Sequence, residues 1–246
     1  MIVLVIAFFI TAVLYASVGF GGGSTYTALL ALADIDYRIF PLVALACNIV
    51  VVAGSTIRFA RARITPWKNA LILTGIAAPA AFAGGLTPIE KGAFLTILGA
   101  SLVLTAISLV LPVSEKAIGK PNWAMRFVPL LTMPLGYLAG LVGIGGGIFL
   151  APFLHLTRWN GAREIASTTS FFILVNSVSG LAGQLVKGGA DRLSMAIDVG
   201  LPLLVAVAIG GQLGSLLALK YLPTRWIRLG TAALTAWVGL RLLFEL

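Results

Sequence analysis

The sequence predicts an all-α, polytopic membrane protein with two internal repeats, each opening on a helix that glycines break. Three observations predict this fold. Of 246 residues, 59% are hydrophobic and 10% are charged, whereas a soluble domain carries roughly 25% charged residues. Apolar stretches of about 17 to 25 residues recur along the chain, each long enough to cross a hydrocarbon core of roughly 30 Å. Two matched glycine clusters lie half the chain apart. A soluble globule is excluded, and so is an outer-membrane barrel, whose strands alternate apolar and polar residues.

Eight apolar stretches account for almost the whole chain, and short polar loops join them. The stretches lie near residues 1–33, 39–57, 69–87, 92–112, 127–154, 166–186, 195–219 and 226–244. Loops this short are typical of one integral domain. We expect a first transmembrane repeat over residues 1–112, a linker over 113–126 and a second repeat over 127–246.

The two glycine clusters define the repeats. Residues 19–23 read G-F-G-G-G and residues 143–147 read G-I-G-G-G, with an offset of 124 residues. The small-residue pairs 84–85 and 210–211 echo each other at corresponding positions. Because glycine costs about 1 kcal/mol relative to alanine inside a helix, four glycines in five residues predict a break. Each interrupted stretch should therefore form two half-helices that meet inside the membrane.

Charge favours an inverted arrangement of the two repeats. If all eight stretches cross, ten Lys and Arg residues lie on one side and seven on the other; if the two broken stretches are hairpins, the counts become twelve and five. The positive-inside rule prefers the second arrangement, with both termini outside. Parallel repeats of four crossings remain the alternative, since residues 1–18 would form about 27 Å of helix, enough to cross.

The broken helices predict an anion site. Broken backbone survives in hydrocarbon only where protein or a water-lined cavity surrounds it, and the half-helices that begin near Ser24 and Ile148 would direct N–H donors and positive dipole ends inward. Thr27 would add a hydroxyl donor. The alternative is that these glycines only allow close helix packing. The candidate substrate-binding residues are Gly21, Gly22, Gly23, Ser24, Thr25, Asn48, Gly145, Gly146, Gly147 and Asn176.

Other polar residues within the stretches have weaker interpretations. Asn48 and Asn176 occupy related positions in the repeats, and each amide could bind substrate, cap the broken backbone or bond to a neighbouring helix. At least two of the four hydroxyl residues at 167–170 should bond back to their own helix. Gln184 is expected near a membrane interface.

Other function classes lack the residues that they need. One histidine, His155, and one cysteine, Cys47, predict no metal site, and the sequence offers no catalytic cluster of the kind that an intramembrane enzyme requires. Neither glycine cluster continues into a nucleotide-binding motif, so no cofactor is expected. The cations are dispersed, which argues against nucleic acid as a partner. The expected partners are a small anion, membrane lipids and a coupling proton or sodium ion, while the pattern favours no oligomeric state.

The glycine-containing segments at 19–32 and 140–154 resemble the TauE/SafE family, the sulfite exporters, and the resemblance extends over the whole chain. It implies a secondary transporter that exports sulfite or organosulfonates across the bacterial cytoplasmic membrane. The family glycines match those of both clusters, and Pro152 also matches. Ala28 stands where the first copy would carry the corresponding proline, which leaves the substrate open. The alternatives are an anion channel or a transporter for another small anion or carboxylate.

Overall fold

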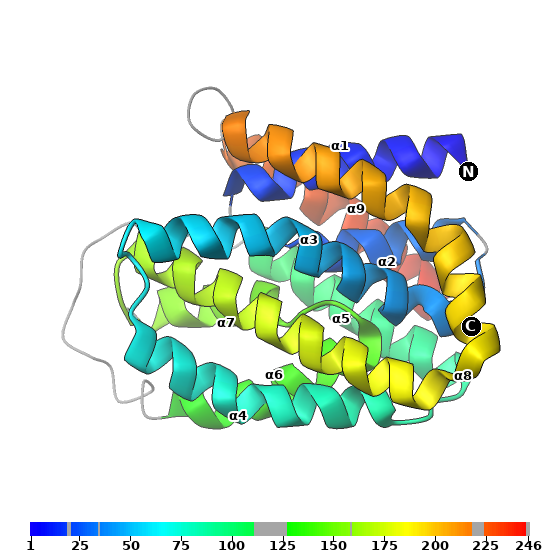
Figure 1. Ribbon diagram of the computed structural model, residues 1–246, viewed down its shortest axis with the longest axis horizontal. Coiled ribbons are helices and arrows are strands. Elements are labelled where there is room, and N and C mark those ends of the chain that lie inside the picture. Colours follow the sequence, from blue (N-terminus) through cyan, green and yellow to red (C-terminus); the bar gives the residue numbers. More distant parts are fainter. Residues whose placement is uncertain (19–20, 34, 111–126, 158, 218–223, 245–246) are drawn as a thin grey trace.

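Figure 1 shows a computed structural model of the chain. It describes residues 1–18, 21–33, 35–110, 127–157, 159–217 and 224–244. Within these residues the regular elements are helices, with no strand. The elements are α1 (Ile2–Val18), α2 (Gly23–Leu32), the short 3-10 helix η1 (Tyr37–Ile39), α3 (Phe40–Arg61), α4 (Trp67–Leu86), α5 (Lys91–Val110), α6 (Val128–Val142), α7 (Gly147–Leu156), α8 (Ala162–Leu217) and α9 (Thr224–Phe244).

The helices confirm the prediction of a polytopic membrane protein. By length and composition, four segments of the described chain can cross a membrane: Tyr37–Arg61, Trp67–Leu86, Lys91–Val110 and Ala162–Gly214. Shorter apolar helices cover Ile2–Ala16, Val128–Val142, Gly147–Leu156 and Ala232–Phe244. Large apolar side chains stay exposed on these helices, as at Leu130 (68%) and Val186 (71%). Such exposure is expected where lipid, rather than water, is the solvent.

The sixth and seventh apolar stretches form one long element that turns back on itself (Figure 1). The expectation of a loop at residues 187–192 is wrong, because helix continues up to Gly189 and resumes directly after it. Gly189 has φ 69° and ψ 173°, a conformation that only glycine adopts readily. A single residue therefore reverses the chain, and α8 consists of an N-terminal and a C-terminal segment on either side of it.

Both glycine clusters break their helices as predicted. In the first repeat α1 ends at Val18 and α2 begins at Gly23; in the second, α6 ends at Val142 and α7 begins at Gly147. Gly143, Gly145 and Gly146 all have positive φ, at 86°, 80° and 74°. Residues with a Cβ are strained in this region. The second break thus depends on glycine for its backbone conformation.

The chain direction is that of inverted repeats. In Figure 1, α1 and α2 run in opposite directions, so the pair enters and leaves at the same end of the molecule, and α3, α4 and α5 then cross in turn. The pair α6 and α7 does the same from the opposite end, followed by the two segments of α8 and by α9. As a result α9 ends where α1 begins. The parallel alternative does not fit this path, and the expected linker at 113–126 lies outside the described residues.

The two repeats are packed into each other through the small-residue pairs. A Cβ at Gly84 on α4 would collide with the carbonyl oxygen of Tyr137 on α6. A Cβ at Gly210, on the C-terminal segment of α8, would lie 2.6 Å from the carbonyl oxygen of Phe9 on α1. Such close backbone approach is how small residues stabilise helix pairs in membranes. A crossing helix of each repeat therefore packs against the broken helix of the other repeat.

The predicted orientation can be tested with single cysteines. Ala62 follows α3 and Ala190 follows the turn in α8, both are exposed, and they lie at opposite ends of the molecule. We expect Ala62→Cys to react with an impermeant thiol reagent only from the cytoplasm and Ala190→Cys only from outside. Cys47 is fully buried and supplies the unlabelled control. Labelling of both cysteines from one side would contradict the inverted arrangement. The inverted arrangement also places position 222 on the cytoplasmic side, but that residue lies outside the described residues.

Candidate functional site

The starts of the two half-helices meet in the interior. A Cβ added to Gly23, the first residue of α2, would lie 2.6 Å from the carbonyl oxygen of Ile144 in the second glycine cluster. Gly22 is the N-cap of α2, and Gly146 is the N-cap of α7. The sequence prediction that both breaks contribute to one place is therefore met by the geometry. Absence of a Cβ is what allows the two backbones to approach this closely.

Asn48 on α3 lies between the two glycine clusters. A Cβ at Gly21 would lie 2.6 Å from Asn48 Oδ1, and a Cβ at Gly145 would lie 2.9 Å from Asn48 Nδ2. The same amide nitrogen faces Gly23. Asn48 is fully buried. Its side chain consequently contacts the backbone of both breaks at once.

The N-terminal segment of α8 closes the other side. A Cβ at Gly145 would lie 3.0 Å from Ile173 Cγ2 and 3.3 Å from Ser177 Oγ, and a Cβ at Gly147 would meet Ile173 and Thr169. Asn176 is the neighbour of Ser177 in the chain and is fully buried. This segment therefore brings the hydroxyl of Ser177 and the side chain of Thr169 to the second break, with Asn176 beside them in the chain.

Many of these buried polar atoms have no hydrogen-bond partner in the described part of the chain. They are Ser24 Oγ, Tyr26 OH, Thr168 Oγ1, Thr169 Oγ1, Ser177 Oγ and both amide atoms of Asn48 and of Asn176. An unsatisfied buried polar group costs about 1–3 kcal/mol. Native interiors rarely keep such a group without a reason. Thr56 Oγ1 and Thr105 Oγ1 are also without a partner in the described residues. Because Ser24, Tyr26, Asn48, Thr169 and Ser177 lie at the breaks, the breaks are the place where a polar ligand would be bound.

The two helix starts are equally unsatisfied. The N-caps of α2 and α7 are glycines, and neither makes a side-chain cap hydrogen bond. The first N–H groups of a helix have no partner within the helix, so a buried helix start needs another acceptor. Within the described residues neither amide atom of Asn48 has a hydrogen-bond partner, so Asn48 does not cap the described ends of the broken backbone. The positive ends of two helix dipoles therefore face this region uncapped.

Several polar residues have roles that the sequence did not predict. Thr25 is buried, and its hydroxyl lies 2.9 Å from that of Tyr15 on α1. Thr27 donates to the carbonyls of Gly23 and Ser24 in its own helix, 3.0 Å away in each case, so it does not supply a donor to the site. These two threonines are structural within the first hairpin, whereas Ser24 remains open.

Two more expectations need correction. The hydroxyl of Ser167 pairs with that of Thr65 at 2.6 Å across the fold, and the hydroxyls of Thr168 and Thr169 have no partner in the described residues. Fewer than two of the four hydroxyl residues at 167–170 therefore bond back to their own helix. Gln184 is not at an interface: it is 1% exposed, and its Nε2 donates to the carbonyl oxygen of Gly140 at 2.9 Å. It therefore caps the C-terminal end of α6 directly before the second break.

Tyr26, Thr169 and Ser177 were missed as candidates for the site. Tyr26 is fully buried and its ring faces Gly22, where a Cβ would lie 2.9 Å from the hydroxyl oxygen. The signal for Ser177 is its place beside Asn176. Nothing in the hydropathy pattern separates Thr169 from the hydroxyl residues around it. A Cβ at Gly146 would lie 3.1 Å from the carbonyl oxygen of Leu135 and 3.2 Å from Ala139 and Phe172, so no polar side chain faces it. Gly146 therefore shapes the backbone.

The site is electrically neutral apart from the helix ends. All side chains that surround the two breaks in the described residues are amides, hydroxyls or apolar groups. Nor does the described chain hold a group of His, Cys, Asp or Glu able to bind a metal ion. What this arrangement offers a ligand is a set of neutral donors and two positive dipole ends.

Comparison with known proteins decides the family. The family model described as "Sulfite exporter TauE/SafE" matches residues 4–242. The chain belongs to the TauE/SafE family. A relative named as a probable membrane transporter protein, y4hK of Sinorhizobium fredii, is 33% identical, covering 98% of this chain and 97% of the relative. YunE of Bacillus subtilis, named in the same way, is 21% identical with 99% and 97% coverage. No solved structure matches the chain.

This TauE/SafE protein is a multi-pass membrane transporter. The named relatives and the apolar helices agree on that assignment, which in bacteria places the protein in the inner membrane. MamO of Magnetospirillum gryphiswaldense, also named as a probable membrane transporter protein, shares 25% identity over 46% of this chain but only 18% of its own length. The resemblance read from the two glycine segments is thus confirmed at the level of family and transport.

Proposed function

We propose that this TauE/SafE protein exports small sulfur-containing anions, such as sulfite or organosulfonates, by secondary transport. The observation that carries the proposal is the meeting of two uncapped helix starts around the partnerless amide of Asn48. Asn176, also partnerless, lies beside Ser177 on the α8 segment that packs against the second break. A sulfite or sulfonate group presents several acceptor oxygens on one compact centre. Amide N–H, hydroxyl and backbone N–H donors match that chemistry, and the dipole ends supply the positive potential.

Neutral donors suit a solute that must also leave. A transporter has to bind its substrate weakly enough to release it on the other side of the membrane, and a site without a full opposite charge meets that need. The inverted repeats supply the motion, since rocking one repeat against the other exposes a site at their junction alternately to each side. In this scheme Asn48 belongs to the first repeat and Asn176 to the second, so one anion would bridge both.

The further elements of the proposal follow from the same geometry. The C-terminal ends of α1 and α6 carry the negative ends of their helix dipoles beside the anion region, and these could hold a coupling proton or a sodium ion. Membrane lipids surround the protein, and neither a nucleic acid nor a cofactor takes part. The protein is not an enzyme in this proposal, because its central groups are hydrogen-bond donors rather than paired acids, bases or nucleophiles.

Binding is the first test of this function. Purified protein is heated with sulfite, sulfate, thiosulfate, sulfoacetate or taurine, and with chloride at the same ionic strength as a control. A ligand present at about 100 times its Kd stabilises the folded state by about 2.7 kcal/mol, so we expect a rise in Tm of about 5 °C with sulfite or sulfoacetate. If none of these anions raised Tm more than chloride does, the proposed substrate class would be refuted.

Transport is the second test. Protein in liposomes loaded with unlabelled sulfite should accumulate radiolabelled sulfite by counterflow, and the initial rate should saturate with concentration. Saturable counterflow requires a site that alternates between the two sides. A channel with the same donors would instead give a flux that follows the electrochemical gradient without counterflow, and that outcome would replace the transporter with a channel.

A further inference from the structure

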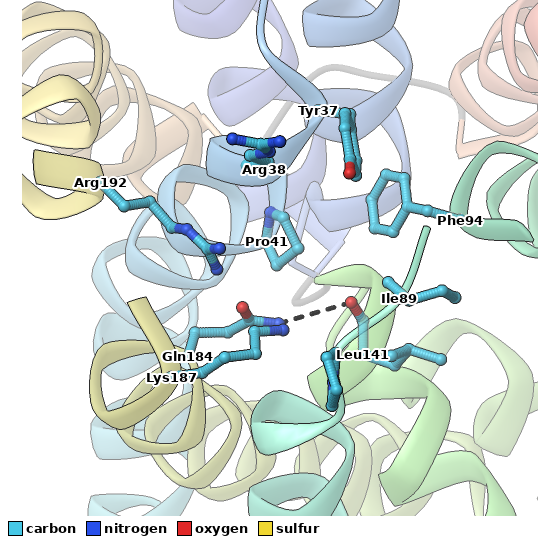
Figure 2. Close-up of a pocket in the computed structure, with 10 residues that line it drawn as sticks. Tyr37, Arg38, Pro41, Ile89, Phe94, Leu141, Gln184, Lys187 and Arg192 are labelled. Carbon is cyan, nitrogen blue, oxygen red and sulfur yellow. Dashed lines mark hydrogen bonds between the residues drawn. The ribbon is translucent and has the colours of Figure 1, made fainter. Parts of the chain in front are cut away.

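A second polar region lies apart from the central site. A cavity of about 360 Å³ opens where α3 begins, α4 ends and α8 turns at Gly189. Figure 2 shows its wall, with the side chains of Arg38, Lys187 and Arg192 around it and Gln184 and Leu141 at its base. In Figure 1 this end of the molecule is also the end at which α1 begins. The cavity thus faces the side that the charge pattern assigns to the exterior.

The cavity collects positive charge. Arg38 comes from η1, while Lys187 and Arg192 lie on either side of the Gly189 turn. None of the residues described as lining the cavity is acidic. The nearby Asp36 is exposed, and its carboxylate accepts a hydrogen bond from the backbone N–H of Arg38 at 2.9 Å. Asp36, Glu90 and Asp191 are exposed chain neighbours of lining residues, but none of them lines the cavity. The three cations that do line it therefore give a positive potential inside a concave space, where field lines are focused.

One of the three cations already makes a hydrogen bond within the protein. Lys187 Nζ donates to the carbonyl oxygen of Thr87 at 3.0 Å, at the C-terminal end of α4. This contact fixes the ammonium group in place and leaves two of its three donors for other acceptors. In Figure 2, Arg192 reaches toward the cavity from the same side as Lys187, since both belong to α8, and Arg38 lies above them on η1. Donors from two directions can therefore converge on one oxyanion.

The base of the cavity leads to the second glycine break. Leu141 and Pro41 both line the cavity, and a Cβ at Gly143 would lie 2.7 Å from Pro41 Cα. The C-terminal end of a helix carries negative partial charge and would repel an anion. Gln184 offsets this by donating to the carbonyl of Gly140 at the end of α6. Only the α6 terminus and the break separate the cavity from the central site.

These cations lie on the side of the membrane that carries fewer Lys and Arg residues in the predicted orientation. In the predicted orientation, five of the 17 Lys and Arg residues face outside: Arg38, Lys91, Lys187, Arg192 and Arg241. Three of these five line one cavity. Outer loops tend to lack cations, so their convergence in a concave space calls for a local role.

We propose that this cavity is an outer anion vestibule, a second oxyanion-binding site that holds the transported anion on the outer side of the second glycine break. The inference rests on the proposed transport of small anions. Arg192, Lys187 and Arg38 bind the anion's oxygens, and the central donors around Asn48 receive it from or pass it to the vestibule. The vestibule determines the affinity for the anion on the outer side and the ionic-strength dependence of that affinity. The central site determines the rate of the transport cycle.

The kinetic test uses Arg38→Gln, Arg192→Gln and the double variant in liposomes of phosphatidylcholine alone. We expect the KM for sulfite counterflow to rise about tenfold at low ionic strength in the double variant, with kcat unchanged, and its salt dependence to fall. Lys91→Gln is the matched control, since Lys91 is exposed at the same end but does not line the cavity. An unchanged KM in the double variant would overturn the proposal. So would a defect that appears only when anionic lipid is present, because the cations would then serve a lipid headgroup.

A labelling test separates the vestibule from transport itself. Ile89 lines the cavity, and Ile89→Cys keeps all three cations. A sulfonate-bearing methanethiosulfonate should react about tenfold faster than its trimethylammonium counterpart, and the preference should vanish with Arg38→Gln and Arg192→Gln. Sulfoacetate, which unlike sulfite does not attack the reagent, should slow the reaction, also when Asn48→Leu has removed the central site. Equal rates for the two reagents would refute the vestibule even if sulfite is transported. A clear preference without any counterflow would instead refute only the proposed transport.

Discussion

A protein in which leucine replaces Asn48 is expected to fold with unchanged or increased stability and to lose anion binding. Leucine has nearly the same shape as asparagine, and the buried Asn48 amide has no partner whose loss would cost free energy. Replacing an unsatisfied polar group removes a penalty of about 1–3 kcal/mol. A hydrogen bond to a charged ligand is worth about 1.5–3 kcal/mol, so the Kd for sulfite should rise about tenfold to a hundredfold. Chemical denaturation and ligand-dependent Tm measure the two effects separately.

Gln184→Leu is the matched control for this substitution. Its amide is as deeply buried but donates to the carbonyl of Gly140, so removing it leaves an acceptor unsatisfied. We expect a loss of about 1–3 kcal/mol of stability in that variant. Asn176→Leu should behave like Asn48→Leu. If Asn48→Leu were destabilised to the same extent as Gln184→Leu and kept its affinity, the amide would be structural and the proposed site would be wrong.

The broken helices could be predicted because their cause is local. Four glycines in five residues cannot continue a helix cheaply, and the second cluster uses positive φ at Gly143, Gly145 and Gly146. Two such clusters at matched positions, together with the distribution of Lys and Arg, were enough to predict hairpins and inverted repeats. No tertiary information was needed for either step. Asn48 and Asn176 could be chosen on the same basis, since amides are rare in hydrocarbon.

The roles of the hydroxyl residues depended on partners that the sequence does not display. Thr25 is paired because Tyr15 lies across the hairpin, and Ser167 is paired because Thr65 comes from another repeat. Neighbouring hydroxyls such as Ser24 and Thr169 remain open. Equivalent residue types thus divide into structural and available groups only after the helices are packed. Hydropathy and residue spacing therefore cannot predict which hydroxyl groups are paired and which are available.

The cationic cavity was beyond prediction for a related reason. Arg38 and Arg192 each fall near the end of an apolar stretch, where hydration by water or lipid headgroups is the ordinary interpretation. Their convergence depends on the Gly189 turn in α8, which replaces the expected loop and returns the chain beside the start of α3. A change in the conformation of one glycine therefore decides which charges become neighbours.

The packing of each repeat's crossing helix against the other repeat's broken helix connects the fold with transport. Gly84 and Gly210 bring α4 against α6 and the C-terminal segment of α8 against α1. Each broken helix is thus held by the other repeat, and the two breaks touch at Gly23 and Ile144. Movement of one repeat must then displace a half-helix start relative to its counterpart. The central donors would be brought together or separated by the same motion that opens the site.

Alanine at Gly23 is expected to abolish transport, although alanine is the better helix former. Local propensity alone predicts a gain of about 0.5–1 kcal/mol for this change. The added methyl, however, would lie 2.6 Å from the carbonyl oxygen of Ile144 and would press on the Asn48 amide. The Ile144 contact is backbone, which cannot rotate away, so α2 must shift from the second break. We expect the counterflow rate to fall at least about tenfold, since a misplacement of about 1 Å in a positioned site costs on the order of a hundredfold.

Gly75→Ala provides the comparison that isolates this effect. Gly75 lies in α4, is exposed and has no atom within 4 Å of an added Cβ. This variant should gain the stability that comes from the higher helix propensity of alanine, and it should transport sulfite like the parent protein. Both variants are made in the same background, and their Tm, Kd and counterflow rates are measured together. Equal transport by Gly23→Ala and Gly75→Ala would mean that the two breaks need not touch. The anion would then have to be bound elsewhere, because a methyl group between Gly23, Ile144 and Asn48 leaves the central donors no common point at which to meet it.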